Sequence, residues 1–174
     1  MERGHTIIED NINALRQGVE LIERIGNGLY ADARPPFLTS GVGGHVRHCI
    51  DFYDSFLSSF ETGRINYALR KRNPQVEMNR RLAISEMEAI IEKLRRLSPA
   101  DLQGTVQVIS EESSGPLDGS GWGRSSVMRE LQSLLSHTIH HYALVAVALR
   151  LQGFEPAAEF GVAPSTLAYW SQTA

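Results

Sequence analysis

The chain has 174 residues, of which 42% are hydrophobic, so it can bury one sizeable core, and its length does not call for a second domain. Its formal net charge of −3 and scattered basic residues argue against a nucleic-acid-binding protein, and no run reaches the ~20 apolar residues of a membrane helix. The N-terminus lacks the apolar core of a signal peptide, and the single cysteine, Cys49, excludes an internal disulfide. We therefore expect one cytoplasmic domain spanning residues 1–174, with no nucleic-acid or membrane partner.

The first part of the chain predicts two helices. Apolar residues recur at helical spacing over residues 6–22, and Gly26 and Gly28 would end this helix. The prolines at 35–36 then favour an extended connection. A second helix is expected over residues 40–63, and its opening glycines indicate either a close approach by another helix or a slow start.

The remaining chain predicts two more helices, separated by a long loop. Residues 65–79 are polar and predicted to be irregular, and residues 79–97 carry a third apolar stripe. The stretch "TVQVIS" at 105–110 alternates like a strand, and the turn-rich sequence after it could complete a small hairpin. A fourth helix should begin at a capping serine, at position 125 or 126, and reach Gly153, and the tail "FGVAPSTLAYW" is expected to dock on the other helices.

Four long amphipathic helices predict an all-α four-helix bundle. Bundles place metal and cofactor sites between facing helices, and we expect the second and fourth helices to be adjacent. The fourth helix contains the stretch "SHTIHHYALVAVALR", which holds three of the six histidines. Any metal site should therefore involve this helix.

His137 and His141 are four residues apart, so they lie on one face of the fourth helix, whereas His140 is rotated by about 100°. The apolar residues expected to flank this face, and to turn it inward, are Leu134, Leu144, Val145 and Ala148. Buried neutral imidazoles need hydrogen-bond partners or a cation. This pair therefore predicts two of the ligands of a metal site.

Two histidines are too few, because catalytic zinc sites usually have three protein ligands. The second helix supplies His45 and His48, and His48 is preferred because it lies one turn before the inward-facing Phe52. His5 and His140 are expected at solvent or at an interface. Cys49 is rotated away from His48 and is expected to be a small buried side chain.

The stretches "GGHVRHCIDFYDSFL" and "RELQSLLSHTIHHYALV" resemble the DinB-like or YfiT-like superfamily of metal-dependent hydrolases. The resemblance covers nearly the whole chain, and "INYALRKRN" and "FGVAPST" are similar to a subgroup known as DinB-like proteins. It implies a four-helix bundle with a divalent metal on His48, His137 and His141. Zinc is the first choice of metal, with nickel, iron and manganese as alternatives.

The superfamily also includes bacillithiol transferases and mycothiol-dependent maleylpyruvate isomerases, and nothing in the sequence singles out either thiol. The resemblance therefore implies a small-molecule substrate, with a low-molecular-weight thiol as one candidate. Members of the superfamily are often dimers, which makes a homodimer a further expectation.

A three-histidine site with an open position suits water activation or the binding and deprotonation of a thiol. Either reaction needs an acid or base, and Asp51 and Glu130 are the candidates, although orienting a histidine is the favoured role for both. Tyr67, Arg70 and Arg72 could hold an anionic group of the substrate, or could simply be solvated. Their part in the site is left open.

Three hypotheses follow from the sequence. The first is a metal-dependent hydrolase or thiol transferase. The second is a non-enzymatic metal-binding or stress-response protein that acts through a partner. The third treats the histidines as buried polar structure without a metal.

Overall fold

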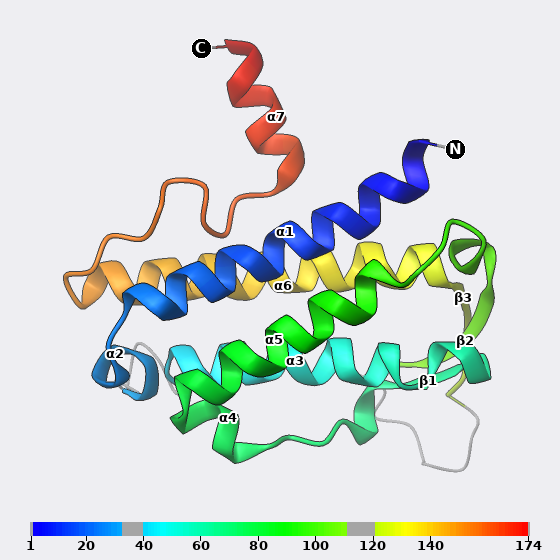
Figure 1. Ribbon diagram of the computed structural model, residues 1–174, viewed down its shortest axis with the longest axis horizontal. Coiled ribbons are helices and arrows are strands. Elements are labelled where there is room, and N and C mark those ends of the chain that lie inside the picture. Colours follow the sequence, from blue (N-terminus) through cyan, green and yellow to red (C-terminus); the bar gives the residue numbers. More distant parts are fainter. Residues whose placement is uncertain (1, 33–39, 111–120, 174) are drawn as a thin grey trace.

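Four long helices form the body of the molecule, and each packs against two others (Figure 1). The computed structural model describes residues 2–32, 40–110 and 121–173, with side chains from residue 7 onward, so the expectation for the side chain of His5 lies outside what is described. The long helices are α1 (Glu2–Arg24), α3 (Val42–Leu57), α5 (Arg80–Arg95) and α6 (Val127–Leu151). Helices α1 and α3 each contact both α5 and α6. The predicted second and fourth helices, α3 and α6, are thus adjacent.

The fold is mainly helical, as expected, but it also contains a small mixed sheet, so it is not purely all-α. Strands β1 (Arg64–Asn66), β2 (Thr105–Ile109) and β3 (Gly123–Ser126) form a three-stranded sheet, with β1 parallel and β3 antiparallel to β2. The strand expected from "TVQVIS" is β2, and its pairing with β3 confirms a small hairpin. The sequence between them at 111–120 lies outside the described residues. Strand β1 was missed because three residues are too few to show an alternating pattern.

The expectation of an irregular segment before α5 was also wrong. It contains β1, the 3₁₀ turn η2 (Tyr67–Leu69) and the short helix α4 (Pro74–Met78). Asn73 caps α4 by accepting a hydrogen bond from the Gln75 amide, and Pro74 occupies the first helical position, where its missing N–H costs nothing. These local signals define a helix of only five residues.

The ends of the long helices follow capping signals. Asn79 caps α5 by accepting from the amides of Arg81 and Leu82, and Ser126 caps α6 by accepting from the Arg129 amide at 3.2 Å. Ser126 was one of the two predicted caps. Helix α3 ends at Leu57 instead of extending to residue 63, and the 3₁₀ turn η1 (Phe60–Thr62) follows it.

The glycines at the start of α3 reflect a close approach. A Cβ on Gly43 would overlap the carbonyl of Glu77 in α4, so only glycine lets the two backbones meet there. The short helix α2 (Asn27–Ala31) also contacts α3 and α4. This packing fixes the first turn of α3, from which His45 projects.

The C-terminal helix α7 (Pro164–Thr173) stands away from the bundle, and none of its residues is buried (Figure 1). The expectation that the whole tail docks was therefore wrong. The docked residue is Phe160, which is buried and stacks on Tyr142 with ring centroids 4.7 Å apart. Gly161 then turns the chain with a φ of +74°, beside the backbone of Ala143.

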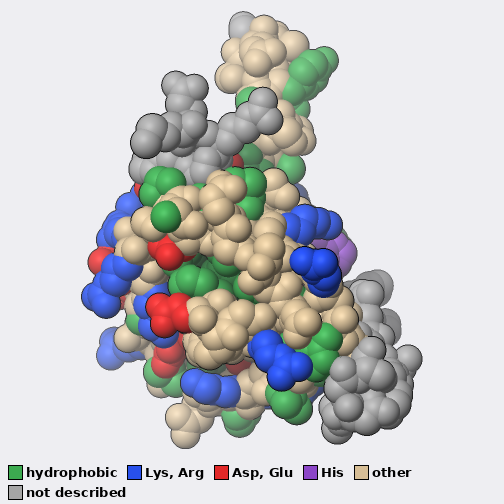
Figure 2. Space-filling model, turned by 90° about the vertical axis from the view of Figure 1, so that its right-hand side faces the viewer, with side chains coloured by type: hydrophobic (Ala, Val, Ile, Leu, Met, Phe, Trp, Pro, Cys, Tyr) green, Lys and Arg blue, Asp and Glu red, His purple; other side chains and the backbone are tan. Residues whose placement is uncertain are grey.

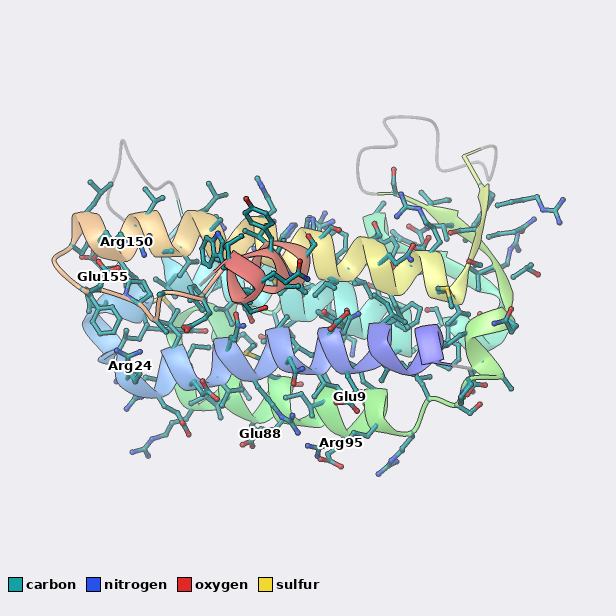
Figure 3. The ribbon with its side chains drawn as sticks, turned by 90° about the horizontal axis from the view of Figure 1, so that it is seen from above. Glu9, Arg24, Glu88, Arg95, Arg150 and Glu155 are labelled. Carbon is teal, nitrogen blue, oxygen red and sulfur yellow. The ribbon has the colours of Figure 1, made fainter. Side chains whose placement is uncertain are left out.

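The surface carries charges of both signs. At the end of the bundle shown in Figure 2, Lys and Arg side chains are interspersed with Asp and Glu side chains. Arg150, in the last turn of α6, pairs at 2.8 Å with Glu155, which lies just beyond the helix (Figure 3). Within the described chain, no helix is both long and apolar enough to cross a membrane. The single domain over residues 1–174 and the homodimer stay predictions.

Candidate metal centre

Three histidines from two helices meet between α3 and α6. His48 projects from α3, while His137 and His141 project from successive turns of α6, and each offers one nitrogen within 4.8 Å of the others. Their ring centroids are 4.5–4.8 Å apart. Two nitrogens bound to one zinc ion at ~2.1 Å can be at most ~4.2 Å apart. Ring shifts of less than about 1 Å would therefore let all three reach one ion.

A fourth histidine lies beside this cluster. The Nδ1 atoms of His45 and His141 are 2.9 Å apart, which is a hydrogen bond in which one ring donates and the other accepts. With Nδ1 of His141 engaged in this way, its Nε2 is the nitrogen left for a cation. His48 thus belongs to the close group of three, and His45 contacts it from the preceding turn of α3.

The surroundings of the cluster favour neutral imidazole rings. Burial, together with the neighbouring His137 and Arg70, lowers the pKa of His48 to about 3. Burial, together with His137 and His48, likewise lowers the pKa of His141 to about 3. The pKa of His45 is lowered mainly by burial. Neutral imidazole is the form that binds metal ions.

The inward face of α6 is largely as predicted. His140 is exposed, and Leu134, Val145 and Ala148 are buried around the cluster. Leu144 is the exception, because 42% of its surface is exposed. It lies three residues beyond His141, at a position of the helix that faces solvent.

Cys49 is buried, as expected for a small core residue. Burial raises the pKa of its thiol to about 12, so it stays protonated at neutral pH. Metal binding requires the thiolate. Cys49 is therefore a packing residue, although it directly follows His48 in the sequence.

Neither carboxylate expected to orient a histidine does so. Asp51 is buried and accepts a hydrogen bond from Arg47 at 2.8 Å, and Arg47 also bonds to Glu77 at 2.8 Å. Glu130 bonds to Tyr67 and Ser125. His45, which was considered only as an alternative ligand, hydrogen-bonds to His141 of the cluster. The sequence did carry a signal for this contact, because His45 lies three residues before His48 and therefore on the same face of the helix.

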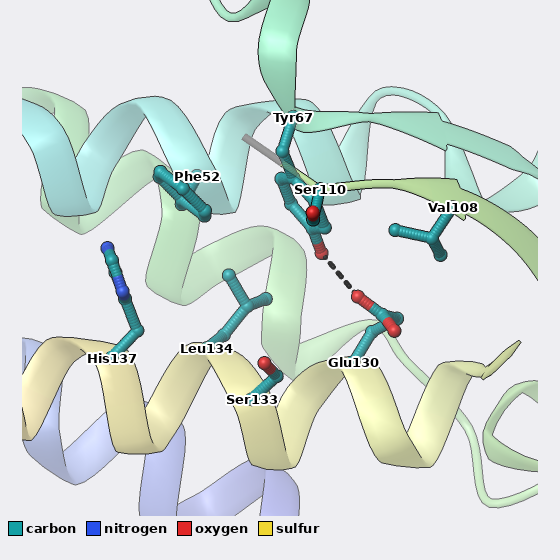
Figure 4. Close-up of a pocket in the computed structure, with 8 residues that line it drawn as sticks. All are labelled: Phe52, Tyr67, Val108, Ser110, Glu130, Ser133, Leu134 and His137. Atoms are coloured by element: carbon teal, nitrogen blue, oxygen red, sulfur yellow. Dashed lines mark hydrogen bonds between the residues drawn. The ribbon is translucent and has the colours of Figure 1, made fainter. Parts of the chain in front are cut away.

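A cavity of about 270 Å³ opens beside His137 and runs along α6 toward Glu130 (Figure 4). Glu130, Ser133, Leu134 and His137 line it from one face of α6, because these positions recur at helical spacing. Its other lining residues, from α3, η2, β2 and the residue after β2, are Phe52, Tyr67, Val108 and Ser110. The predicted metal cluster thus adjoins a space large enough for a small molecule.

Phe52 joins the histidines to the rest of the cavity. Its ring stacks on His137 at 4.4 Å and on Tyr67 at 5.0 Å. The guanidinium of Arg70 lies 5.2 Å from the centre of the same ring. Arg72 is exposed, which fits the solvated alternative considered from the sequence, whereas Tyr67 is buried.

Tyr67 and Glu130 form the far end of the cavity. The buried Tyr67 hydroxyl donates to Glu130 Oε2 at 2.9 Å, and the Ser125 hydroxyl donates to Oε1 at 2.5 Å. Burial, together with the charge of Glu130, raises the pKa of Tyr67 above its usual range. Tyr67 is therefore a hydrogen-bond donor at neutral pH.

No protein-family model and no curated protein matches the chain. What the structure shows is a mainly helical protein whose three-histidine cluster could hold a metal ion. The likeness to the DinB-like or YfiT-like superfamily rests on the sequence motifs.

Proposed function

We propose that the chain binds one divalent metal ion through His48, His137 and His141, and that it uses this ion as a hydrolase or thiol transferase of the DinB-like or YfiT-like type. The observation that carries the proposal is the convergence of three imidazoles at the end of a cavity. Three protein ligands leave a coordination position for a substrate. Imidazole nitrogens suit zinc best, and they also bind nickel and iron, whereas manganese prefers oxygen ligands.

The residues around the cluster have distinct tasks in this proposal. A bound divalent ion would supply Lewis acidity to a substrate atom. His137 lines the cavity, so it sets which side of the ion faces the substrate. Phe52 and Leu134 form apolar walls that limit water next to the cluster. His45 holds the ring of His141 through the 2.9 Å contact between their Nδ1 atoms.

The cavity favours an enzyme over a metal-binding protein that acts through a partner, since a purely structural or storage site has no need of an adjoining space for a ligand. The purely structural hypothesis is also disfavoured. Neighbouring imidazoles add to the burial that lowers the pKa values of His48 and His141, and a shared cation turns this crowding into ligation.

A metal-dependent substrate screen tests the proposal. Protein stripped by a chelator would be reloaded separately with zinc, nickel, iron or manganese. Each form would be assayed for ester, amide and phosphoester hydrolysis and for transfer of small thiols to electrophiles. We expect turnover by the loaded wild type and none by His137→Gln. If the two proteins behave alike on every substrate while the wild type retains metal, the non-enzymatic alternative is correct. If the wild type retains no metal, the whole proposal is wrong.

A further inference from the structure

Among the described residues that line the cavity, Glu130 is the acidic one, and only 7% of its surface is exposed. Its two hydrogen-bond partners, Tyr67 and Ser125, are both neutral hydroxyls. Across the described parts of the chain, no lysine or arginine forms a salt bridge with it. A buried carboxylate is thus held at the cavity wall by hydroxyl groups alone.

This arrangement leaves capacity for a further partner. Both Glu130 oxygens act as acceptors, which is the pattern of an ionised carboxylate, and such a group offers about four acceptor sites. Two of these sites are used by the hydroxyl groups. Because a buried charge is costly unless it is paired, a cation entering the cavity would find a strong partner there.

The opposite end of the cavity has the opposite character. His137 is located there, next to the other two histidines of the cluster. The guanidinium of Arg70 lies over Phe52, which also stacks on His137. With a divalent ion on the histidines, this end would be positive while the Glu130 end is negative. The cavity would therefore orient a ligand that carries charges of both signs.

We propose that the ligand of this cavity is a small molecule with an anionic, metal-binding group at one end and an ammonium group at the other, and that Glu130 binds the ammonium. The first half of this inference rests on the proposed metal function. The second half rests on Glu130, Tyr67 and Ser125. Leu134, which lies between the two ends, provides an apolar contact for a linker (Figure 4).

The helix sets the length of the linker. Glu130 and His137 are seven residues apart on α6, which corresponds to ~10.5 Å along the axis. A metal–sulfur bond of ~2.3 Å and an N–H···O contact of ~2.9 Å together take up about half of this length. The linker between a thiolate and an ammonium group should then be about three to five methylene groups.

A series of ω-aminoalkanethiols with two to six methylene groups tests this. Each would be titrated into cobalt-loaded protein, and the thiolate-to-cobalt charge-transfer band would give its Kd. The matched ω-hydroxyalkanethiols supply the comparison without a cation. We expect the amines to bind about 10-fold more tightly than the alcohols at the best length, because an ammonium–carboxylate ion pair replaces a hydrogen bond from an uncharged hydroxyl. Glu130→Gln should abolish this difference, while Glu88→Gln, at an exposed position, should preserve it.

The cation site is also tested without the metal. Butylammonium would be titrated into metal-free wild type and Glu130→Gln, and binding would be followed through NMR shifts of Tyr67 and Ser125. We expect saturable shifts in the wild type only, and equal behaviour of the two proteins would overturn the inference. Equal affinities of the amine and alcohol series for the wild type would overturn it as well. If cobalt does not bind, the proposed function fails, and the butylammonium result still decides the role of Glu130.

Discussion

Two clusters of polar side chains lie between the helices, and they are built on different principles. In the first, which we call the asparagine cluster, Asn11 donates to the carbonyls of Ile7 and Leu131 and accepts from the Tyr53 hydroxyl at 2.7 Å. Asn11 and Tyr53 are fully buried. Donors meet acceptors, so the cluster joins α1, α3 and α6 without needing a ligand.

The second, which we call the histidine cluster, consists of His45, His48, His137 and His141. It repeats one chemical group four times, its rings are half-buried, and it opens on a cavity. A cluster in which hydrogen-bond donors pair with acceptors stabilises the fold by itself. A cluster of several imidazoles, whose nitrogen lone pairs face one another, is instead suited to bind a cation. The two clusters should therefore respond differently to mutation.

The largest expected effect is on metal binding. His48→Gln, His137→Gln and His141→Gln should each weaken metal binding by more than the ~10–100-fold typical for loss of an outer partner, because each removes a direct ligand. His140→Gln, at an exposed position on the same helix, should retain most of the metal. Metal content after dialysis, together with competition against a chelator of known affinity, measures this. Equal losses in His137→Gln and His140→Gln would show that the inward face has been misassigned.

The asparagine cluster should show the reverse behaviour. Asn11→Ala removes the acceptor of the buried Tyr53 hydroxyl and one of the donors to the Leu131 carbonyl, and a buried donor left without an acceptor costs ~1–3 kcal/mol. The free energy of unfolding in urea should fall by that order, with metal stoichiometry unchanged. The exposed Asn13→Ala, on the same helix, is the matched control and should change stability little. A large loss of metal in Asn11→Ala would remove the distinction between the clusters.

His45→Phe should have an intermediate effect. It keeps a ring of similar shape but removes the hydrogen bond to His141, so metal affinity should fall within the ~10–100-fold range. In ¹⁵N NMR of the metal-loaded wild type, His141 should bind through Nε2, and His45 should show no metal-bound nitrogen. A metal-bound shift for His45 would make it a fourth ligand. Unchanged affinity in His45→Phe would show that this hydrogen bond does not support the site.

The smallest expected effect concerns pH and stability without metal. The folded pKa values of His48 and His141 are about 3, below the ordinary value near ~6.5, so the unfolded chain binds more protons between these limits. The stability contributed by the neutral rings is therefore complete above pH ~6.5 and is lost as pH falls toward 3. The Tm of metal-free protein should drop by several degrees between pH 7 and 5. His48→Gln should reduce this slope, whereas Asn11→Ala should lower Tm at both pH values and keep the slope.

The features that could be predicted from the sequence are those that follow from local periodicity. The stripes located the four long helices, and a spacing of four residues placed His137 and His141 on one face. His48 could be placed because Phe52, one turn later, marks the inner face of α3. The hydrogen-bonded pairs could not be predicted in this way, because Tyr67 lies 63 residues from Glu130 in the sequence and His45 lies 96 residues from His141. Such contacts depend on how distant elements pack, which no local pattern encodes.

The most direct test of the proposed three-histidine site is to identify the atoms that bind the metal. Metal-free protein would be loaded with zinc, freed of excess ion, and measured for zinc content and for X-ray absorption at the zinc edge. The account predicts one zinc per chain, with three imidazole nitrogens at ~2.0–2.1 Å and no sulfur from the protein. Failure to retain zinc would contradict it, and so would a zinc–sulfur distance of ~2.3 Å, because Cys49 would then be a ligand.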